Sequence, residues 1–137
     1  MLLTTSAAFA GGAIPLVASA AAKGEGEQPK VAPVPIARVD EVPPGESRRF
    51  DFPPVARSAL LIHVPGEGLR AYSDECTHLG CAVFWEPGRL QILCPCHKGS
   101  FNPIDGSPLQ GPPRRPLDRI ALEIRDGIIY AVGGGAV

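Results

Sequence analysis

Apolar and polar residues alternate in short runs along most of the chain. The runs VPIARV, SRRFDF, SALLIHV and LRAYS, all of them after residue 33, are rich in branched and aromatic side chains, which is typical of β-strands. No long stretch repeats at the period of about 3.6 residues that marks an amphipathic helix. The pattern predicts an all-β fold, an antiparallel sandwich or barrel of about eight to ten short strands.

Three pairs of these runs flank turn signals. PGEG, at residues 65–68, separates SALLIHV from LRAYS, and PG, at residues 87–88, separates AVFWE from RLQILC. DG, at residues 126–127, separates RIALEIR from IIYAV. Glycine-containing turns, and Asp-Gly above all, favour tight connections between antiparallel strands. We therefore expect three β-hairpins at these positions.

The first 22 residues have a different character. Residues 1–22 contain no charged side chain, and Lys23 ends the run. A helix of this length would span about 33 Å, roughly one bilayer core. The run is only weakly apolar, contains Pro15 and lacks the basic start of a secretory signal. We expect an N-terminal apolar helix at residues 1–22 that is a membrane anchor or the remains of an export signal; a flexible apolar tail is the alternative.

The next segment, residues 23–35, is polar and rich first in Gly and then in Pro. Such a composition predicts an extended, flexible linker rather than part of a core. The remaining residues, 36–137, are enough for one domain. The predicted organisation is therefore an anchor or signal, a linker and a single β-rich head.

Composition narrows the possible functions. The chain of 137 residues has a formal net charge of −1, and its 13 basic residues are scattered, so nothing indicates a nucleic-acid partner. It contains 16 prolines and 16 glycines, as expected for short strands joined by tight turns. The distinctive chemistry lies in its cysteines and histidines.

All four cysteines and two of the three histidines lie between residues 76 and 97. They form two halves, C-x-H-x2-C (Cys76, His78 and Cys81) and C-x-C-H (Cys94, Cys96 and His97). Each half follows a predicted strand and offers one Cys–His pair and one further cysteine. A chain that gathers its soft ligands in this way indicates a metal site or a disulfide-linked loop pair.

Three chemistries are compatible with this set. Two disulfides would use all four thiols in an exported chain, but they leave both histidines without a role. A structural zinc ion takes Cys and His ligands, although zinc-finger motifs favour C-x2–4-C spacing. A two-iron cluster can take two cysteines on one iron and two histidines on the other, and one Cys and one His from each half would supply it.

CTHLGC and CPCHKGSF resemble the two cluster-binding loops of Rieske iron–sulfur proteins, in particular those of cytochrome bc complexes, which read C-T-H-x-G-C and C-P-C-H. Besides the Cys and His positions, Thr77, Gly80 and Pro95 agree with that pattern. GPPRRPL, at residues 111–117, resembles the proline loop that covers one side of the cluster in this family. The resemblance implies a Rieske-type β head at residues 36–137, with a cluster-binding subdomain of two loops at about residues 74–117.

By this resemblance, Cys76 and Cys94 bind one iron of a [2Fe-2S] cluster and His78 and His97 bind the other, with one cluster per chain. Neutral imidazole donates less charge than thiolate, so such a cluster is easier to reduce than an all-cysteine cluster. An electron gained beside the imidazoles favours their protonated form. The site can then take up an electron and a proton together, as the oxidation of a quinol requires.

The remaining cysteines, Cys81 and Cys96, form a disulfide in the bc-type branch, whereas Rieske ferredoxins and ring-hydroxylating oxygenases generally lack it. A disulfide at this place agrees with an oxidising compartment. We therefore expect a membrane-anchored protein whose head lies on the periplasmic or outer side of the cytoplasmic membrane.

The resemblance implies electron transfer, as the iron–sulfur subunit of a cytochrome bc complex that oxidises menaquinol or ubiquinol. Its expected partners are a cytochrome b-type subunit with the quinol, a cytochrome c-type acceptor, and the membrane at the N-terminus. The chain offers no nucleophile or acid–base pair apart from the cluster ligands, so it is not expected to be catalytic alone. Two alternatives share the resemblance: the small subunit of an arsenite oxidase-like enzyme and a ferredoxin component of an oxygenase.

Two positions depart from the high-potential members of the family, in which C-P-C-H is followed by G-S-x-Y. The Ser and Tyr hydroxyls of that pattern donate to sulfurs of the centre, and Gly99 and Phe101 stand in their places here. Hydrogen bonds to sulfur stabilise the reduced, more negative cluster. We therefore predict a potential in the lower or middle part of the Rieske range, better matched to menaquinol than to ubiquinol. Ser100 would replace one of these bonds only after a shift of the loop.

One apolar residue lies within the first ligand motif. Leu79, between His78 and Gly80, is interpreted either as a shield over the cluster or as an apolar contact with the partner that binds the quinone. An exposed apolar side chain at a loop tip often marks a docking surface.

Overall fold

The structure, a computed structural model, describes residues 31–53 and 56–135 of the chain. These residues form ten strands and one short 3-10 helix, η1 (Val39–Glu41). The strands are β1 (Val34–Arg38), β2 (Ser47–Phe52), β3 (Ala56–Val64), β4 (Gly68–Ser73), β5 (Phe84–Glu86), β6 (Gln91–Cys94), β7 (Gly99–Phe101), β8 (Pro108–Gln110), β9 (Arg119–Arg125) and β10 (Ile128–Gly135). The predicted all-β class is confirmed.

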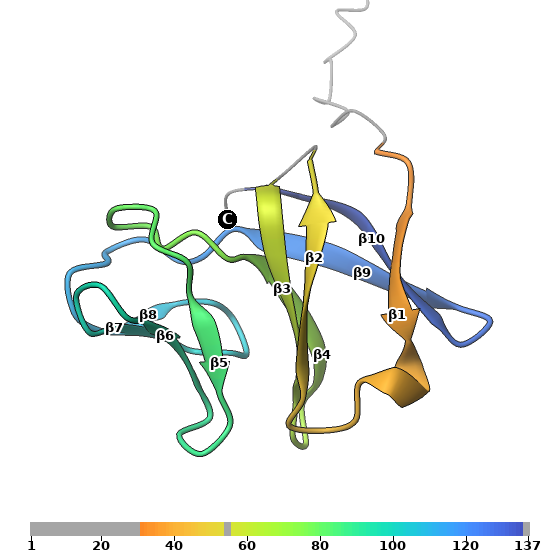
Figure 1. Cartoon of the computed structure of the whole chain (residues 1–137), viewed down its shortest axis with the longest axis horizontal. Helices are drawn as coiled ribbons and strands as arrows, with labels where there is room; N and C mark the ends of the chain where they lie inside the picture. The colour runs from red at the N-terminus through yellow and green to blue at the C-terminus, as the bar shows by residue number, and fades with distance from the viewer. Residues whose placement is uncertain (1–30, 54–55, 136–137) are drawn as a thin grey trace, which may run out of the picture.

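The strands form two antiparallel sheets, which Figure 1 shows side by side. The larger sheet has six strands in the order β1-β10-β9-β4-β3-β2, and the smaller has four in the order β5-β6-β7-β8. Strand β1 lies beside β10, and β4 lies beside β9. These two pairings bring distant parts of the chain into one sheet, whereas the remaining pairings join strands that are neighbours in sequence.

The three predicted hairpins are confirmed as the pairs β3–β4, β5–β6 and β9–β10. In the last of these, Asp126 has a φ of 51° and Gly127 a φ of 74°. Positive φ at both central residues is the geometry of a type I′ turn, whose twist matches that of the flanking strands, and Asp-Gly adopts it readily. The turn residues alone therefore account for this connection.

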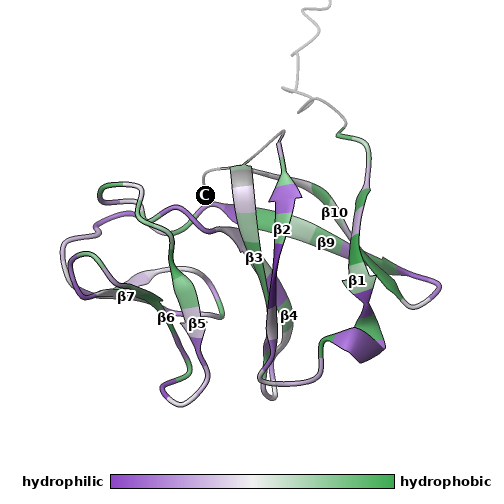
Figure 2. Cartoon of the chain, viewed as in Figure 1, coloured by the Kyte–Doolittle hydropathy of each residue, from purple (hydrophilic) through white to green (hydrophobic). Residues whose placement is uncertain are grey.

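The core lies on both faces of β3. Leu60 and Ile62 belong to an apolar cluster that also includes Ile92 and Phe101 of the small sheet, whereas Leu61 belongs to a second cluster inside the large sheet. Neighbouring residues of a strand point to opposite faces, so an almost wholly apolar strand can serve two cores. Figure 2 shows apolar residues along β1, β5 and β10 and polar residues in η1.

The small sheet carries the cysteine- and histidine-bearing segments. The first loop, residues 76–81, lies between β4 and β5, and the second loop, residues 94–99, joins β6 to β7. The proline loop, residues 111–117, follows β8. In Figure 1 these loops lie at the left, at the opposite side of the molecule from the β9–β10 turn.

The N-terminal part of the head begins earlier than residue 36. Strand β1 starts at Val34, and Val34 and Pro35, the last two residues of the predicted linker, pair with Ala131 and Tyr130 of β10. The predicted apolar helix at residues 1–22 and most of the predicted linker lie outside the described residues. Within residues 31–53 and 56–135, no helix is long and apolar enough to cross a membrane.

Candidate metal centre

The first loop is closed by its own backbone. The N–H of Cys76 donates to the carbonyl oxygen of Cys81 (2.8 Å), and the N–H of Gly80 donates to that of Cys76 (2.8 Å). Gly80 has a φ of 76°, a left-handed conformation that glycine adopts at little cost. This turn places His78 and Leu79, both exposed, at the tip of the loop.

The second loop is a tight connection between β6 and β7. Cys94 and Gly99 face each other across the two strands, and Lys98 takes a φ of 54° just before β7 begins. The loop leaves His97 exposed while the preceding strand keeps Cys94 buried. Each loop therefore presents one exposed histidine and one buried cysteine.

A disulfide joins the two loops. Cys81 and Cys96 are bonded, with their Cα atoms 6.4 Å apart, so the disulfide that the resemblance implied is present. The first loop leads from β4 of the large sheet to β5 of the small sheet, whereas the second joins β6 to β7 within the small sheet. The bond holds the tips of the two loops together. The two free cysteines of the described residues are Cys76 and Cys94, and both are buried.

The histidines meet at the joined loop tips. The ring centroids of His78 and His97 are 4.9 Å apart, and the ring planes are at 89° to each other. Both side chains are exposed to solvent. Residues from two different loops therefore form one surface pair of imidazoles, as a shared ligand role would require.

The two free thiols, in contrast, are buried within the apolar cluster between the sheets. Burial raises the pKa of the Cys76 thiol; the N–H groups of His78 and Leu79 lower it, and the adjacent Cys94 thiol raises it further. A buried thiolate is costly unless a cation accompanies it. The two amides that donate toward the Cys76 sulfur would stabilise the charge of a metal-bound thiolate.

This donor set fits a [2Fe-2S] cluster. The thiols form a buried pair and the imidazoles an exposed pair. Two sulfur ligands at one depth and two nitrogen ligands at another suit the two irons of a cluster with unequal ligand sets.

The proline loop packs against both ligand loops. Thr77 Oγ1 donates to the carbonyl oxygen of Arg115 (2.7 Å). Gly111 has a φ of 90°, and a Cβ atom placed on it would lie 2.7 Å from the Gly99 Cα. A Cβ atom placed on Gly99 would in turn lie 3.0 Å from Pro113 Cγ. The proline loop therefore covers the second loop at a distance that only small residues permit.

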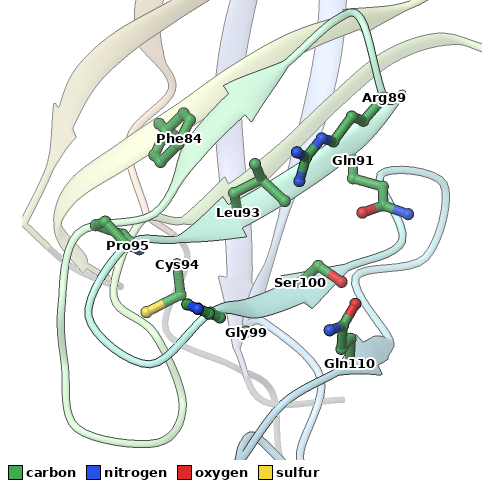
Figure 3. A pocket seen from close by; sticks show the side chains of 10 residues that line it. Phe84, Arg89, Gln91, Leu93, Cys94, Pro95, Gly99, Ser100 and Gln110 are labelled. Atoms are coloured by element: carbon green, nitrogen blue, oxygen red, sulfur yellow. The ribbon is translucent and has the colours of Figure 1, made fainter.

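The positions that depart from the high-potential pattern are buried. Gly99 and Phe101 are both in the interior, and neither carries a hydroxyl. Ser100 shares its face of the sheet with Leu93 rather than Cys94, because facing residues of paired strands point the same way. Figure 3 shows the Ser100 oxygen directed away from the Cys94 sulfur. The replacement bond considered for Ser100 is therefore not formed in this structure.

The surface beside His78 is both apolar and basic. Leu79 is 66% exposed, which favours its interpretation as a contact for a partner. A hollow of about 470 Å³ lies beside His78 and is lined by Thr77, His78, Gly111, Pro112, Arg114 and Arg115. Both arginines come from the proline loop, so this loop contributes charge as well as cover.

Sequence patterns did not identify the ion pair behind the first loop. Asp74, two residues before Cys76, accepts hydrogen bonds from Arg49 of β2 and from Ser58 Oγ of β3. These contacts cross 25 and 16 residues of sequence. No local motif signals such a contact, because it depends on the pairing of β2, β3 and β4.

The fold and the centre together define a small iron–sulfur domain built on two β-sheets. Residues 32–121 match the model of the Rieske [2Fe-2S] domain, and this match covers more than half of the chain. The chain belongs to the Rieske [2Fe-2S] domain family. The predicted [2Fe-2S] cofactor is confirmed by this membership, and the four ligand assignments stay a prediction.

Individual relatives are similar over the same region. The chain is 34% identical over 97 residues to the cytochrome b6-f complex iron-sulfur subunit of Chlorobaculum thiosulfatiphilum, covering 70% of this chain and 51% of that protein. It is 34% identical over 111 residues to the menaquinol:cytochrome c reductase iron-sulfur subunit of Geobacillus thermodenitrificans, covering 71% and 64%. The chain thus spans between about half and two thirds of the length of these curated relatives.

A solved structure gives the same fold. The cyanobacterial plasma membrane Rieske protein of Synechocystis PCC 6803 superposes with a TM-score of 0.66 at 24% sequence identity, covering 73% of this chain and 99% of that one. At this identity the likeness establishes the fold. The predicted Rieske-type architecture is therefore confirmed.

Proposed function

We propose that the chain is the electron-carrying iron–sulfur subunit of a quinol-oxidising cytochrome bc complex. In this proposal Cys76 and Cys94 hold one iron of the [2Fe-2S] cluster, and His78 and His97 hold the other. The cluster, when bound, supplies a one-electron acceptor and donor at the tip of the head. Similarity to subunits named for a cytochrome b6-f complex and for a menaquinol:cytochrome c reductase supports this assignment.

The observation that carries the proposal is the difference in depth between the two ligand pairs. The imidazoles of His78 and His97 are exposed and face each other, whereas the thiols of Cys76 and Cys94 are buried. A quinol can therefore reach the histidine side of the centre directly. The sulfur side lies in the apolar core, where solvent does not reach it.

The imidazoles and Leu79 at the tip have different roles in quinol oxidation. With one ring nitrogen bound to metal, the other nitrogen of a neutral imidazole carries a proton; once it has lost that proton, it can accept a hydrogen bond from a quinol hydroxyl and then take up the proton of that hydroxyl. Leu79 offers an apolar contact beside His78 for the ring or for its binding site. The chain thus binds the quinol and takes its proton at the place where the electron enters.

A menaquinol donor is proposed in preference to ubiquinol. Gly99 and Phe101 supply no hydroxyl to the sulfurs, and Ser100 faces the other side of the sheet. Fewer hydrogen bonds to sulfur leave the reduced state less stable and the potential lower. A centre with a low reduction potential accepts electrons readily only from a quinol of low potential, which here is menaquinol.

The proposed setting is the outer side of the cytoplasmic membrane. Residues 1–22 would anchor the chain, and the segment that follows would tether the head so that it moves between a cytochrome b-type donor site and a cytochrome c-type acceptor. The Cys81–Cys96 disulfide supports an oxidising compartment. It also counts against an oxygenase ferredoxin, a class that generally lacks this bond.

A redox titration of the purified holoprotein across pH tests the proposal. We expect a one-electron centre whose reduced state gives a paramagnetic signal with a low average g. Its potential should fall as pH rises, because reduction is accompanied by protonation of an imidazole. A colourless protein loaded with zinc, or a potential that does not change with pH, would contradict the assignment.

A further inference from the structure

One arginine ties both ends of the first loop to the large sheet. Arg49, on β2, donates from Nη1 to Oδ2 of Asp74 and from Nη2 to the carbonyl oxygen of Val83 (2.6 Å). Asp74 precedes Cys76 by two residues, and Val83 follows Cys81 by two. A single guanidinium therefore bridges the entry and the exit of the loop.

Backbone hydrogen bonds connect the residues that Arg49 contacts to the cysteines of the loop. The N–H of Val83 donates to the carbonyl oxygen of Asp74 (2.7 Å), and the N–H of Cys76 donates to that of Cys81 (2.8 Å). One antiparallel bridge lies between these two bonds. The two arms of the loop thus form a short ladder that runs from the arginine to the ligand positions, and a displacement at its base moves the tip.

The environment of the pair explains why an arginine is needed. The Asp74 side chain is 7% exposed, whereas that of Arg49 is 44% exposed. Ser58 Oγ also donates to Oδ2 of Asp74 (2.8 Å). A buried carboxylate is stable only when it is paired and hydrogen-bonded. The planar guanidinium offers two donors in a fixed geometry, one for the carboxylate and one for the carbonyl, which a lysine cannot reproduce.

We propose that Arg49 is a positioning residue for the iron–sulfur cluster. Through Asp74 and Val83 it holds the first loop so that Cys76 and His78 face their partners on the second loop. The inference rests on the proposed function only in treating these two residues as ligands. Arg49 itself lies outside both ligand motifs and acts through the backbone of the loop.

Arg49→Gln in the full-length holoprotein tests this role, and Arg48→Gln is its matched control. Arg48 is the next residue on the same strand, and its guanidinium lies 3.6 Å from Glu41 at the surface. Both variants remove one positive charge. Arg49→Gln should lose its visible absorption to an iron chelator at least about tenfold faster than the wild type, because a buried charged group loses its partner. Arg48→Gln should match the wild type.

A double variant separates position from charge. Arg49→Gln alone should lower the potential and broaden the paramagnetic signal, and Asp74→Asn alone should shift the potential upward. In Arg49→Gln/Asp74→Asn the two charge effects cancel, yet the faster cluster loss should persist because the Val83 carbonyl remains untied. A double variant that is wild-type in both respects would overturn the positioning role and leave only a charge effect.

Amide hydrogen exchange of the metal-free protein gives a readout that needs no cluster. Arg49→Gln should speed exchange at the N–H of Cys76 and of Val83 while the amides of β9 and β10 stay protected, and Arg49→Lys should be intermediate. Equal exchange in Arg49→Gln and Arg48→Gln would overturn the inference. A different result would separate the two ideas. If the wild-type protein binds no iron, yet Arg49→Gln exchanges faster than Arg48→Gln, the proposed function is contradicted while the role of Arg49 in holding the loop remains.

Discussion

At the scale of single residues, the positions next to the thiols, Gly99 and Phe101, are the ones predicted to tune the potential of the centre. Phe101 is fully buried, so a hydroxyl added to its ring brings one more polar atom into the interior, where it needs a hydrogen-bond partner. Gly99 is different, because a Cβ atom there lies 3.0 and 3.1 Å from two carbons of Pro113. A side chain at residue 99 is possible only if Pro113 moves by a few tenths of an ångström. The two substitutions therefore differ in cost.

Phe101→Tyr should raise the reduction potential, and Gly99→Ser/Phe101→Tyr should raise it further. A hydrogen bond to a charged group contributes about 1.5 kcal/mol, which for one electron corresponds to a shift of about 60 mV per bond. A redox titration measures the shift, with Phe84→Tyr on the outer face of the small sheet as the control. Potentials that stay at the wild-type value in correctly folded variants would refute this explanation of the tuning.

Tyr72 predicts how stability changes at high pH. Burial raises its pKa from 10.0 to about 12, and its hydroxyl donates to the carbonyl oxygen of Pro103 (2.8 Å). The folded state keeps the proton longer than the unfolded state, so stability falls as pH rises from 10 toward 12. Tyr72→Phe should be about 1 kcal/mol less stable at neutral pH, and urea unfolding should show this deficit shrinking above pH 10. A constant deficit at all pH values would contradict the assignment.

At the scale of elements, three separate loops form the proposed centre, and each pair of loops is joined differently. The disulfide joins the first loop to the second. The Thr77 hydroxyl joins the first loop to the proline loop. Close backbone contact at Gly99 and Gly111 joins the second loop to the proline loop. The arrangement is therefore covalent at one contact, polar at another and steric at the third, and each can be removed separately.

Replacing both Cys81 and Cys96 by Ser should destabilise the protein and loosen the loop tips. The bond closes a segment with a sequence separation of 15, for which loop-closure entropy predicts a loss of about 3 kcal/mol. Denaturant unfolding measures this loss, and chelator-driven bleaching measures the loosening. Wild-type protein treated with reductant should behave like the double variant. A double variant as stable as the oxidised wild type would contradict the role of the disulfide.

Gly111→Ala tests the contact between the proline loop and the second loop, with Gly45→Ala as its matched control. Both glycines have a φ of 90°, but a Cβ atom on Gly45 meets nothing within 4 Å, whereas one on Gly111 meets the Gly99 Cα at 2.7 Å. The backbone strain is therefore shared, at about 1–2 kcal/mol. Overpacking should cost Gly111→Ala about 1–3 kcal/mol more in thermal or denaturant unfolding. Equal losses in the two variants would mean that the loops separate easily.

At the scale of the whole molecule, the charge at the tip differs from that of the chain. The formal net charge is −1, yet the hollow beside His78 is lined by Arg114 and Arg115 and by no acidic side chain. Arg115 pairs with Asp118 (2.8 Å), so Arg114 carries most of the local field. Surface fields of this kind change encounter rates and weaken with added salt.

Oxidation of the reduced protein by small complexes of opposite charge should report this field. Arg114→Gln should slow oxidation by ferricyanide about two- to fivefold at low salt and should not slow oxidation by a cationic cobalt complex. Stopped-flow spectroscopy measures both rates. Arg125→Gln, at the opposite end of the head, is the control, because it changes the net charge equally. The same slowing in both variants would show that only net charge matters.

Local sequence was sufficient to predict the features that depend only on residues close together in the chain. The Asp126–Gly127 turn, the other two hairpins and the spacing of the ligand motifs all lie within short segments whose conformation is set by the residues themselves. Each ligand motif occupies one loop, so the sequence alone brings Cys76 near His78, and Cys94 near His97. The resemblance to a known family added the disulfide and the ligand roles.

Tertiary structure decided the features that join distant segments. It paired Val34 and Pro35 of β1 with β10, turned the Ser100 hydroxyl away from the Cys94 sulfur, and brought Arg49 to Asp74 across 25 residues of sequence. These outcomes follow from strand register and from packing between sheets, and a one-residue change of register would reverse them. The sequence by itself therefore determined which groups are predicted to bind the cofactor, and the fold determined how those groups are held, because holding them requires contacts that no local pattern encodes.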